Sequence, residues 1–119
     1  MSDVRQIVGR RGEDIAAAFL LAKGFSEIGR NWRCRMGEID LIVKRGDEVR
    51  FIEVKLRRTD TYGNPEDAIT QGKLRHLARA IECWLRDQPT EPRRYQADAV
   101  AIKCYPGEDP EVVWIEGIL

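Results

Sequence analysis

The spacing of hydrophobic residues along this chain changes from a helical period to a strand-like period and back. Residues 12–23 are rich in alanine and leucine and predict a helix, and Gly24 follows at a position where helices commonly end. Three segments with β-branched and aromatic residues come next, separated by tight connections. They predict a meander of three strands over 28–33, 38–44 and 49–56.

The second half of the chain repeats this change of period. A polar loop with turn residues at 59–65 precedes a predicted long helix over 66–86, whose apolar side chains recur at helical spacing. A proline-containing connection leads to two further strands, predicted over 98–104 and 112–115. The order αβββαββ indicates an α/β (α+β) fold. We expect a single domain over residues 1–119, with a mixed central sheet of about five strands flanked by helices.

Amino-acid composition tells more about the function class of this chain than about its fold. A chain of 119 residues is long enough for one domain with its own core. Its 20 basic and 20 acidic residues give a net charge of zero, so no global charge indicates a strong polyanion binder. Arginine provides 15 of the 20 basic residues, and its planar guanidinium suits both phosphate recognition and surface ion pairs.

The three cysteines, Cys34, Cys83 and Cys104, are odd in number and far apart in the sequence. This spacing indicates neither a disulfide framework nor a zinc site, and it is typical of proteins in a reducing cytoplasm. No apolar run approaches the length of a membrane span, and the first residues lack the core of a signal peptide. We therefore expect a soluble, cytoplasmic protein without a membrane partner.

The second and third predicted strands form a hairpin with an unusual set of charges. Residues i and i+2 of a strand lie on one face, so Glu38 is expected beside Asp40, and Glu53 beside Lys55. A symmetric turn about residues 46–47 opposes residues whose numbers sum to 93. This register pairs Asp40 with Glu53 and Glu38 with Lys55.

Such a pairing predicts a cation site. Directly opposed residues have Cβ atoms roughly 4.5–5.5 Å apart, and like charges at that distance are destabilising. Mg²⁺ prefers oxygen ligands and is often held by one or two carboxylates with water and substrate phosphate. Asp40, Glu53 and the carbonyl of Val54 are therefore candidate ligands for Mg²⁺ or Mn²⁺. Lys55 is a candidate to steer a water or neutralise a phosphate, which indicates hydrolytic chemistry on a phosphate ester.

Simpler explanations exist for each residue taken alone. Glu53 and Lys55 are compatible with an ion pair on a solvated strand, which contributes little to stability. Asp40 is compatible with a turn cap, although the apolar residues 41–43 that follow it favour a buried strand. Packing does not account for Glu38, Asp40, Glu53 and Lys55 together, so the set favours a site.

Glu13 is the candidate contribution from the first predicted helix. It shares a stripe with Ala16, Ala17 and Leu20, the face that we expect against the sheet, where an unpaired carboxylate is costly. The alternative is a place in the first helical turn, where the macrodipole favours acidic residues. His76, the single histidine, lies on the polar side of the second helix, and we interpret it as a surface residue or a phosphate contact.

A helical Glu followed by an Asp and a Glu-x-Lys on adjacent strands resembles the PD-(D/E)XK nuclease superfamily, which has the restriction-endonuclease-like fold. The chain is more closely similar to the YraN-like family of uncharacterised bacterial proteins, which itself resembles archaeal Holliday-junction resolvases. The similarity covers nearly the whole chain. The residues that carry it are Gly12, Glu13, Ala16, Asn31, Arg33, residues 37–41 and 51–55, Arg57, Gly63, Ala68, Lys73 and Asp98.

This resemblance implies that Asp40 and Glu53 are metal ligands, that Lys55 is the catalytic lysine and that Glu13 completes the catalytic set. It also implies a nucleic-acid partner. The basic residues that we expect to contact this partner are Arg33, Arg57, Arg58 and Lys73.

One departure from the family pattern lies in the late strand. The family often has Arg-Phe-Asp there, whereas this chain has Gln96-Ala97-Asp98. The charge at Asp98 is kept, but a basic and an aromatic contact are absent. The departure affects substrate handling more than metal binding.

Together these residues predict a metal-dependent endonuclease that hydrolyses phosphodiester bonds in DNA, with branched or damaged structures as candidate substrates. The alternative is a nucleic-acid-binding module that keeps the nuclease-like fold without useful catalysis, which the zero net charge and the altered late strand favour. A third interpretation is a small adaptor with Trp84 or Trp114 in a protein interface. A nuclease that cuts both strands suits a homodimer, with the edge strand at 112–115 as a candidate contact.

Overall fold

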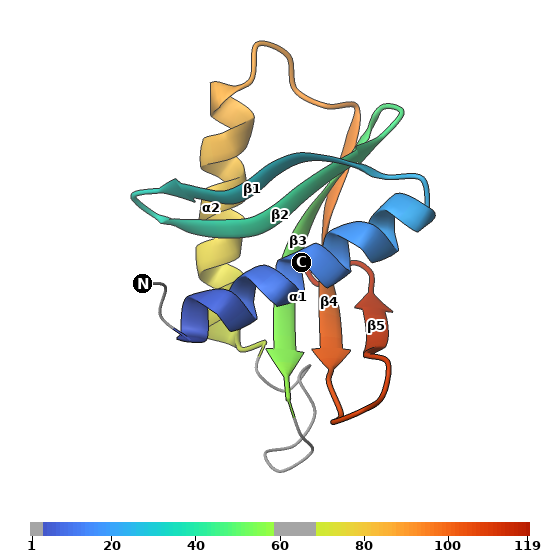
Figure 1. Cartoon of the computed structure of the whole chain (residues 1–119). Helices are drawn as coiled ribbons and strands as arrows, with labels where there is room; N and C mark the ends of the chain where they lie inside the picture. Colours follow the sequence, from blue (N-terminus) through green and yellow to red (C-terminus); the bar gives the residue numbers. More distant parts are fainter. Residues whose placement is uncertain (1–3, 59–68) are drawn as a thin grey trace.

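The computed structural model describes residues 4–58 and 69–119, with side chains from residue 10 onward. A five-stranded sheet forms the centre, and one helix covers each of its faces (Figure 1). The elements in order are helix α1 (Val4–Ala22), strands β1 (Ser26–Cys34), β2 (Gly37–Arg45) and β3 (Glu48–Arg57), helix α2 (Gln71–Asp87), and strands β4 (Arg94–Lys103) and β5 (Glu111–Ile115). This order and the mixed sheet confirm the predicted fold class.

The strands follow one another across the sheet in the order β1-β2-β3-β4-β5. All neighbours are antiparallel except β3 and β4, which run parallel over the whole of β3. A parallel pair needs a crossover connection, and α2 provides it. Pairing with the first residues of β3 also extends β4 back to Arg94, before the predicted start at residue 98, because backbone hydrogen bonds hold a segment whose side-chain pattern alone is irregular.

Both helices begin at other residues than the sequence pattern predicted. Helix α1 starts at Val4, well before residue 12, and ends as predicted, followed by Gly24 at a positive φ of 94°. Helix α2 starts at Gln71 because Thr70 caps it, accepting a hydrogen bond from the Lys73 N–H at 3.3 Å. The predicted loop, residues 66–68 of the predicted helix, Gly63 and Ala68 lie outside the described residues.

Two hydrophobic cores lie between the sheet and the helices, one on each face of the sheet. On the α1 side, Ala16 and Leu20 pack on Phe25, Leu41, Val43, Ile52, Val100 and Ile102. On the α2 side, Leu77, Ala80, Ile81 and Trp84 pack on Ile39, Ile42, Val49, Phe51 and Ala97. Neither helix in the described ranges is long and apolar enough to cross a membrane.

The turn between β1 and β2 lies directly against α2. A Cβ atom added to Gly37 would be 2.6 Å from the backbone oxygen of His76, a distance at which the backbone must move. The neighbouring Met36 carbonyl oxygen lies 3.4 Å from His76 Nδ1. Glycine at position 37 therefore permits a close contact that fixes the turn on the helix.

Gly37→Ala is expected to lower the free energy of unfolding by about 1–3 kcal/mol, because the new methyl group pushes the turn away from the helix backbone. Urea denaturation followed by circular dichroism measures the effect. Gly72→Ala is the matched control, since its Cβ atom would meet only Thr70 Oγ1 at 3.9 Å. We expect the control to be neutral or slightly stabilising. Wild-type stability in Gly37→Ala would contradict the close contact.

Candidate functional site

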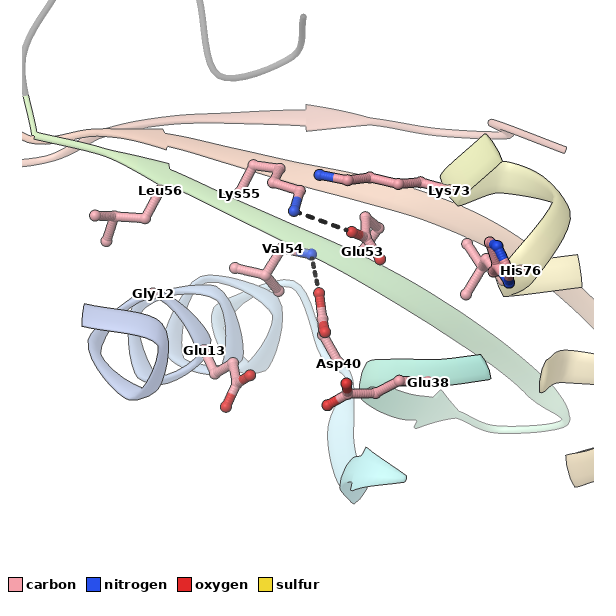
Figure 2. Close-up of a pocket in the computed structure, with 11 residues that line it drawn as sticks. Gly12, Glu13, Glu38, Asp40, Glu53, Val54, Lys55, Leu56, Lys73 and His76 are labelled. Atoms are coloured by element: carbon pink, nitrogen blue, oxygen red, sulfur yellow. Dashed lines mark hydrogen bonds and ion pairs between the residues drawn. The ribbon is translucent and has the colours of Figure 1, made fainter. Parts of the chain in front are cut away.

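An open pocket of about 360 Å³ lies between α1, the start of β2, the end of β3 and the start of α2 (Figure 2). Its lining consists of Gly12, Glu13, Glu38, Asp40, Glu53, Val54, Lys55, Leu56, Lys73, His76 and Leu77. The pocket therefore brings together all four predicted catalytic residues, the predicted carbonyl ligand Val54, and Lys73, one of the predicted nucleic-acid contacts.

The pocket exists because β2 and β3 separate at its centre. The predicted register, in which paired residue numbers sum to 93, holds along the hairpin as far as Leu41 and Ile52. In the described chain, pairing between β2 and β3 stops there. Asp40 Oδ2 instead accepts a hydrogen bond from the Val54 N–H at 2.9 Å, so a side-chain carboxylate replaces the backbone of the neighbouring strand.

The predicted pairing of Glu38 with Lys55 is wrong, because the strands have separated before they reach these residues. Glu38 lies opposite Arg33 on β1, whose Nε is 3.5 Å from Glu38 Oε1. Lys55 pairs along its own strand, with Nζ 3.5 Å from Glu53 Oε1. Asp40 and Glu53 are no ladder pair either, but both carboxylates line the same pocket.

A kink in β1 and β2 accompanies the separation. Residues i and i+2 of a regular strand share a face, but Ile39 and Leu41 pack into cores on opposite faces of the sheet. On β1, Asn31 lies between the pairs Arg30–Leu41 and Trp32–Ile39, and it has a positive φ of 51°. Asparagine tolerates this left-handed conformation better than most residues do. The kink therefore coincides with the point at which Asp40 turns toward β3.

Asn31 also fixes the carboxylate that α1 contributes. Glu13 is only 8% exposed, and its Oε1 accepts a hydrogen bond from Asn31 Nδ2 at 3.0 Å. Burial raises the pKa of Glu13 although this hydrogen bond opposes the shift. Because α1 begins at Val4, Glu13 is not in the first turn, and the macrodipole does not explain it. Asn31 was named only among the residues that carry the family resemblance, without a role in the site. Its sequence signal is an asparagine inside a predicted strand, where that residue is disfavoured.

The charges in the pocket are not balanced by the protein. Burial, and then the charge of Asp40, raises the pKa of Glu53 to about 7 although Lys55 opposes the shift. Burial also raises the pKa of Asp40 against the hydrogen bond from Val54. A hydrogen bond with Lys55, together with burial, lowers the pKa of Lys73. The carboxylates thus favour a nearby cation, and the two lysines favour a nearby anion.

The oxygen atoms at the opening suit a hard divalent cation. The N–H and C=O of one strand residue point to the same edge, so the Val54 carbonyl points toward the opening in which Asp40 meets its N–H. Glu53 completes the predicted set of oxygen donors. No three acidic, imidazole or thiol side chains in the described ranges form a complete metal-binding cluster. The residues therefore fit an ion that completes its coordination with water and substrate phosphate.

The other predicted nucleic-acid contacts lie outside this pocket. Arg33 on β1 has a side chain that is 75% exposed. Arg57 ends β3, and Arg58 lines a separate hollow of about 620 Å³ with Arg11. Their contacts with nucleic acid stay predictions. His76 is exposed, as expected, and lines the pocket.

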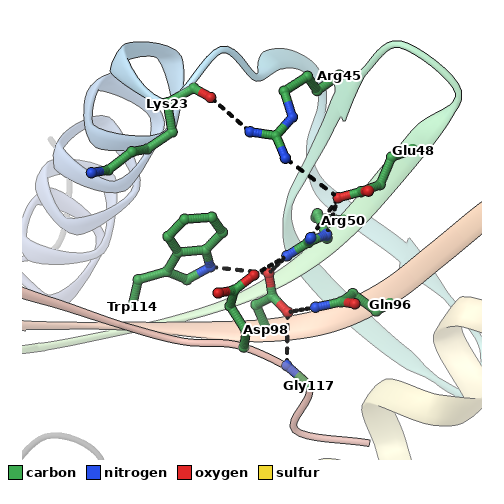
Figure 3. Close-up of polar contacts among 9 residues, drawn as sticks. Lys23, Arg45, Glu48, Arg50, Gln96, Asp98, Trp114 and Gly117 are labelled. Carbon is green, nitrogen blue, oxygen red and sulfur yellow. Dashed lines mark hydrogen bonds and ion pairs between the residues drawn. The ribbon is translucent and has the colours of Figure 1, made fainter.

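Asp98, the acidic residue of β4, is buried inside the fold and does not line the pocket (Figure 3). It is fully buried, and its carboxylate accepts four hydrogen bonds. The donors are Arg50 Nη1 at 2.7 Å, Gln96 Nε2 at 2.8 Å, the Gly117 N–H at 2.9 Å and Trp114 Nε1 at 3.0 Å. Gln96, which departs from the family pattern, therefore supports a structural carboxylate in this chain.

Asp98→Asn is expected to lower the free energy of unfolding by about 3 kcal/mol, because it leaves the buried Arg50 guanidinium without its most buried counter-ion. Chemical denaturation measures the loss. Asp47→Asn is the control, since Asp47 lies in the exposed β2–β3 turn, 3.7 Å from an exposed Arg93, and should change stability little. Similar stabilities for the two variants would contradict a structural role for Asp98.

Glu53→Gln is expected to raise stability at pH 8 relative to wild type and to change it little at pH 4.5. A carboxyl with a pKa raised from 4.5 to about 7 keeps its proton in the folded protein while the unfolded chain loses it. Wild-type stability therefore falls as pH rises through this window, by about 3 kcal/mol for this group.

Urea denaturation in metal-free buffer from pH 4.5 to pH 8 tests this dependence. Glu82→Gln, on the exposed side of α2, is the control and should follow wild type at every pH. A constant difference between Glu53→Gln and wild type would contradict the raised pKa of Glu53.

Comparison with known proteins finds relatives that belong to one family. A UPF0102 protein of Leifsonia xyli is 42% identical over 112 residues, covering 94% of this chain and 95% of the relative. UPF0102 proteins of Mycolicibacterium gilvum and Rhodococcus jostii are 38% identical over 119 residues and 42% identical over 105 residues. These alignments cover 98% and 88% of this chain, and 97% and 89% of the relatives.

The family match agrees with the resemblance found in the sequence. Residues 12–102, from the glycine that precedes Glu13 to the end of the buried part of β4, match the Uncharacterised protein family UPF0102. The match includes every residue of the pocket. The chain therefore belongs to the UPF0102 family, as its YraN-like sequence pattern predicted.

Proposed function

We propose that this chain is a metal-dependent endonuclease that hydrolyses phosphodiester bonds in DNA. The observation that carries this proposal is the opening between β2 and β3, where Asp40 and Glu53 lie beside Lys55 and Lys73 in one pocket. A divalent cation supplies positive charge to the carboxylates, and a phosphodiester supplies negative charge to the lysines.

In this proposal Asp40, Glu53 and the Val54 carbonyl hold Mg²⁺ or Mn²⁺. The bound ion supplies Lewis-acid stabilisation of charge on the phosphate and makes water more acidic. Asp40 is fixed for this role by the Val54 N–H, and Glu53 by Lys55. Pre-positioned ligands bind an ion without a further loss of side-chain freedom.

The lysines act on the substrate. Figure 2 shows Glu53, Lys55 and Lys73 on one side of β3 and Glu13 on the other. Lys55 neutralises the phosphate or orients the attacking water, and Lys73 holds a phosphate oxygen next to it. Glu13, held by Asn31, positions water or Lys55 from the α1 side.

DNA is the proposed partner because arginine side chains outside the pocket suit backbone phosphates. Arg33, Arg57 and Arg58 extend the contact beyond the pocket. Hydrolysis of both strands of a duplex calls for two sites, which a homodimer provides. Among the residues that the structure describes, β5 pairs with β4 alone, which leaves its other edge for such a contact.

Purified protein with Mg²⁺ or Mn²⁺ is expected to nick plasmid DNA or to cut synthetic linear, forked or four-way-branched duplexes. Asp40→Asn and Lys55→Ala should each reduce cleavage by at least about 100-fold, because the first removes a charged metal ligand and the second removes the positive charge beside the phosphate. Asp47→Asn and Lys44→Ala, at the far end of the same hairpin, are the matched controls and should cleave like wild type. Gel assays with and without a chelator measure the rates.

Calorimetric titration with each metal separates catalysis from simple binding. Wild type should bind the ion in the presence of DNA, and Asp40→Asn should bind it weakly. Salt-sensitive DNA binding without cleavage under any metal would favour a nucleic-acid-binding module instead. Cleavage that survives both pocket substitutions would overturn the assignment.

A further inference from the structure

A basic surface adjoins the pocket, where the β1–β2 turn packs on the first half of α2. Residues 31–37 and 69–81 contain five arginines and lysines and no acidic residue, although the whole chain has equal numbers of both charges. The close approach of Gly37 to the His76 backbone, and the Met36 carbonyl oxygen 3.4 Å from His76 Nδ1, hold the two segments together. Positive charge gathered in this way on a neutral chain suits a polyanion.

The basic surface is continuous with the rim of the pocket. Lys73 and His76 line the pocket, and the exposed Arg79 follows at the same spacing of three residues, which makes the three side chains neighbours on the helix. On the turn, Arg33 is 75% exposed, and its Nε lies 3.5 Å from Oε1 of Glu38, another residue of the pocket lining. A polymer with a phosphate in the pocket therefore meets arginine next to it.

An apolar side chain lies at the tip of this basic turn. Met36 is 42% exposed, directly after the exposed Arg35. Figure 1 shows the turn as the end of the β1–β2 hairpin, reaching past α2. Because Gly37 permits a close contact with the helix backbone, the turn has a firm support. Met36 is thus presented to solvent, between arginines, by a turn that the helix holds in place.

This combination is typical of proteins that kink DNA, which insert an apolar wedge such as methionine between base pairs and surround it with basic side chains. We propose that the β1–β2 turn inserts Met36 into the base stack of a DNA duplex whose scissile phosphate lies in the pocket. Arg33, Arg35 and Arg79 hold the flanking phosphates. The inference rests on the proposed function, since it takes DNA as the partner.

The wedge determines which DNA is bound best. Insertion costs the free energy of unstacking the bases, and this cost is lowest where the stack is already interrupted. A mismatch, a bulged base or a branch point provides such a position. A thioether is only a weak hydrogen-bond acceptor, so Met36 does not read the donor and acceptor pattern of a base edge. The preference is therefore for interrupted duplexes of any sequence.

Binding to labelled duplexes in buffer with a chelator tests the wedge separately from cleavage. Wild type should bind a duplex with one bulged base more tightly than the fully paired duplex, and 2-aminopurine beside the bulge should become brighter as it unstacks. Met36→Ala should bind the paired duplex nearly like wild type and lose both the preference and the brightening, whereas Met36→Leu should keep both. Leu21→Ala is the matched control, because Leu21 is an apolar residue of α1 that is 65% exposed outside this surface.

The arginines have a different signature. Arg35→Ala and Arg79→Ala should weaken binding to both duplexes by the same factor. Each should also reduce the slope of log affinity against log salt concentration by about 1, because each removes one phosphate contact. Arg93→Ala is the control and should bind like wild type, since Arg93 is 85% exposed beside Asp47 in the β2–β3 turn, at the other end of the hairpin.

The outcomes separate the wedge from the nuclease. Wild type that unstacks the bulge through Met36 but cuts no DNA with Mg²⁺ or Mn²⁺ would support the wedge and contradict the nuclease. Cleavage by a protein in which Met36→Ala keeps the preference and the brightening would overturn the wedge alone. Equal losses in Met36→Ala and Leu21→Ala, or no binding of wild type to either duplex, would also overturn the proposal. Circular dichroism of each variant verifies its fold.

Discussion

The hydrogen bond from the Val54 N–H to the Asp40 carboxylate is the interaction on which the pocket depends. A sheet that opens inside a protein leaves backbone groups without partners, and buried groups of this kind are costly. Asp40 removes that cost for one N–H at the point where β2 leaves β3. The same bond directs the Val54 carbonyl and the Asp40 carboxylate into one opening. The hydrogen bond that ends the pairing of β2 with β3 therefore also positions two of the proposed metal ligands.

The sequence predicts the order of elements and most of the hairpin register, because both follow from local patterns. The apolar run at 41–43 and the turn at 46–47 determine which residues oppose one another, and pairing follows that register up to Leu41 and Ile52. The point at which pairing stops was not predictable. It depends on the left-handed Asn31 and on a side-chain bond across the opening, and both are tertiary effects. The start of α1 was missed although Val4, Ile7 and Val8 have helical spacing, since Gly9 and Gly12 make this short segment a weak helix former.

This fold has two groups of buried charged residues, which differ in whether the protein itself provides their partners. Around Asp98 every carboxylate oxygen has donors, and Arg50 also pairs with Glu48 and Glu116, so that group is complete without a ligand. In the pocket, burial raises the pKa values of Asp40 and Glu53, and the charge of Asp40 adds to the shift of Glu53. Sequence reasoning treated Asp98 as part of a substrate-handling motif, since one-letter patterns do not distinguish a satisfied carboxylate from an unsatisfied one. Satisfaction of hydrogen bonds makes that distinction.

The separation of the strands has a consequence for solubility. From Glu53 onward β3 pairs with β4 on one side and has lost β2 on the other, so residues 53–57 present an open strand edge. Open edges of this kind invite pairing with another chain, and proteins guard them with charged side chains and covering elements. Here Glu53, Lys55 and the close approach of α1 at Gly12 provide that protection. The charges that form the pocket therefore also protect the protein from edge-to-edge aggregation.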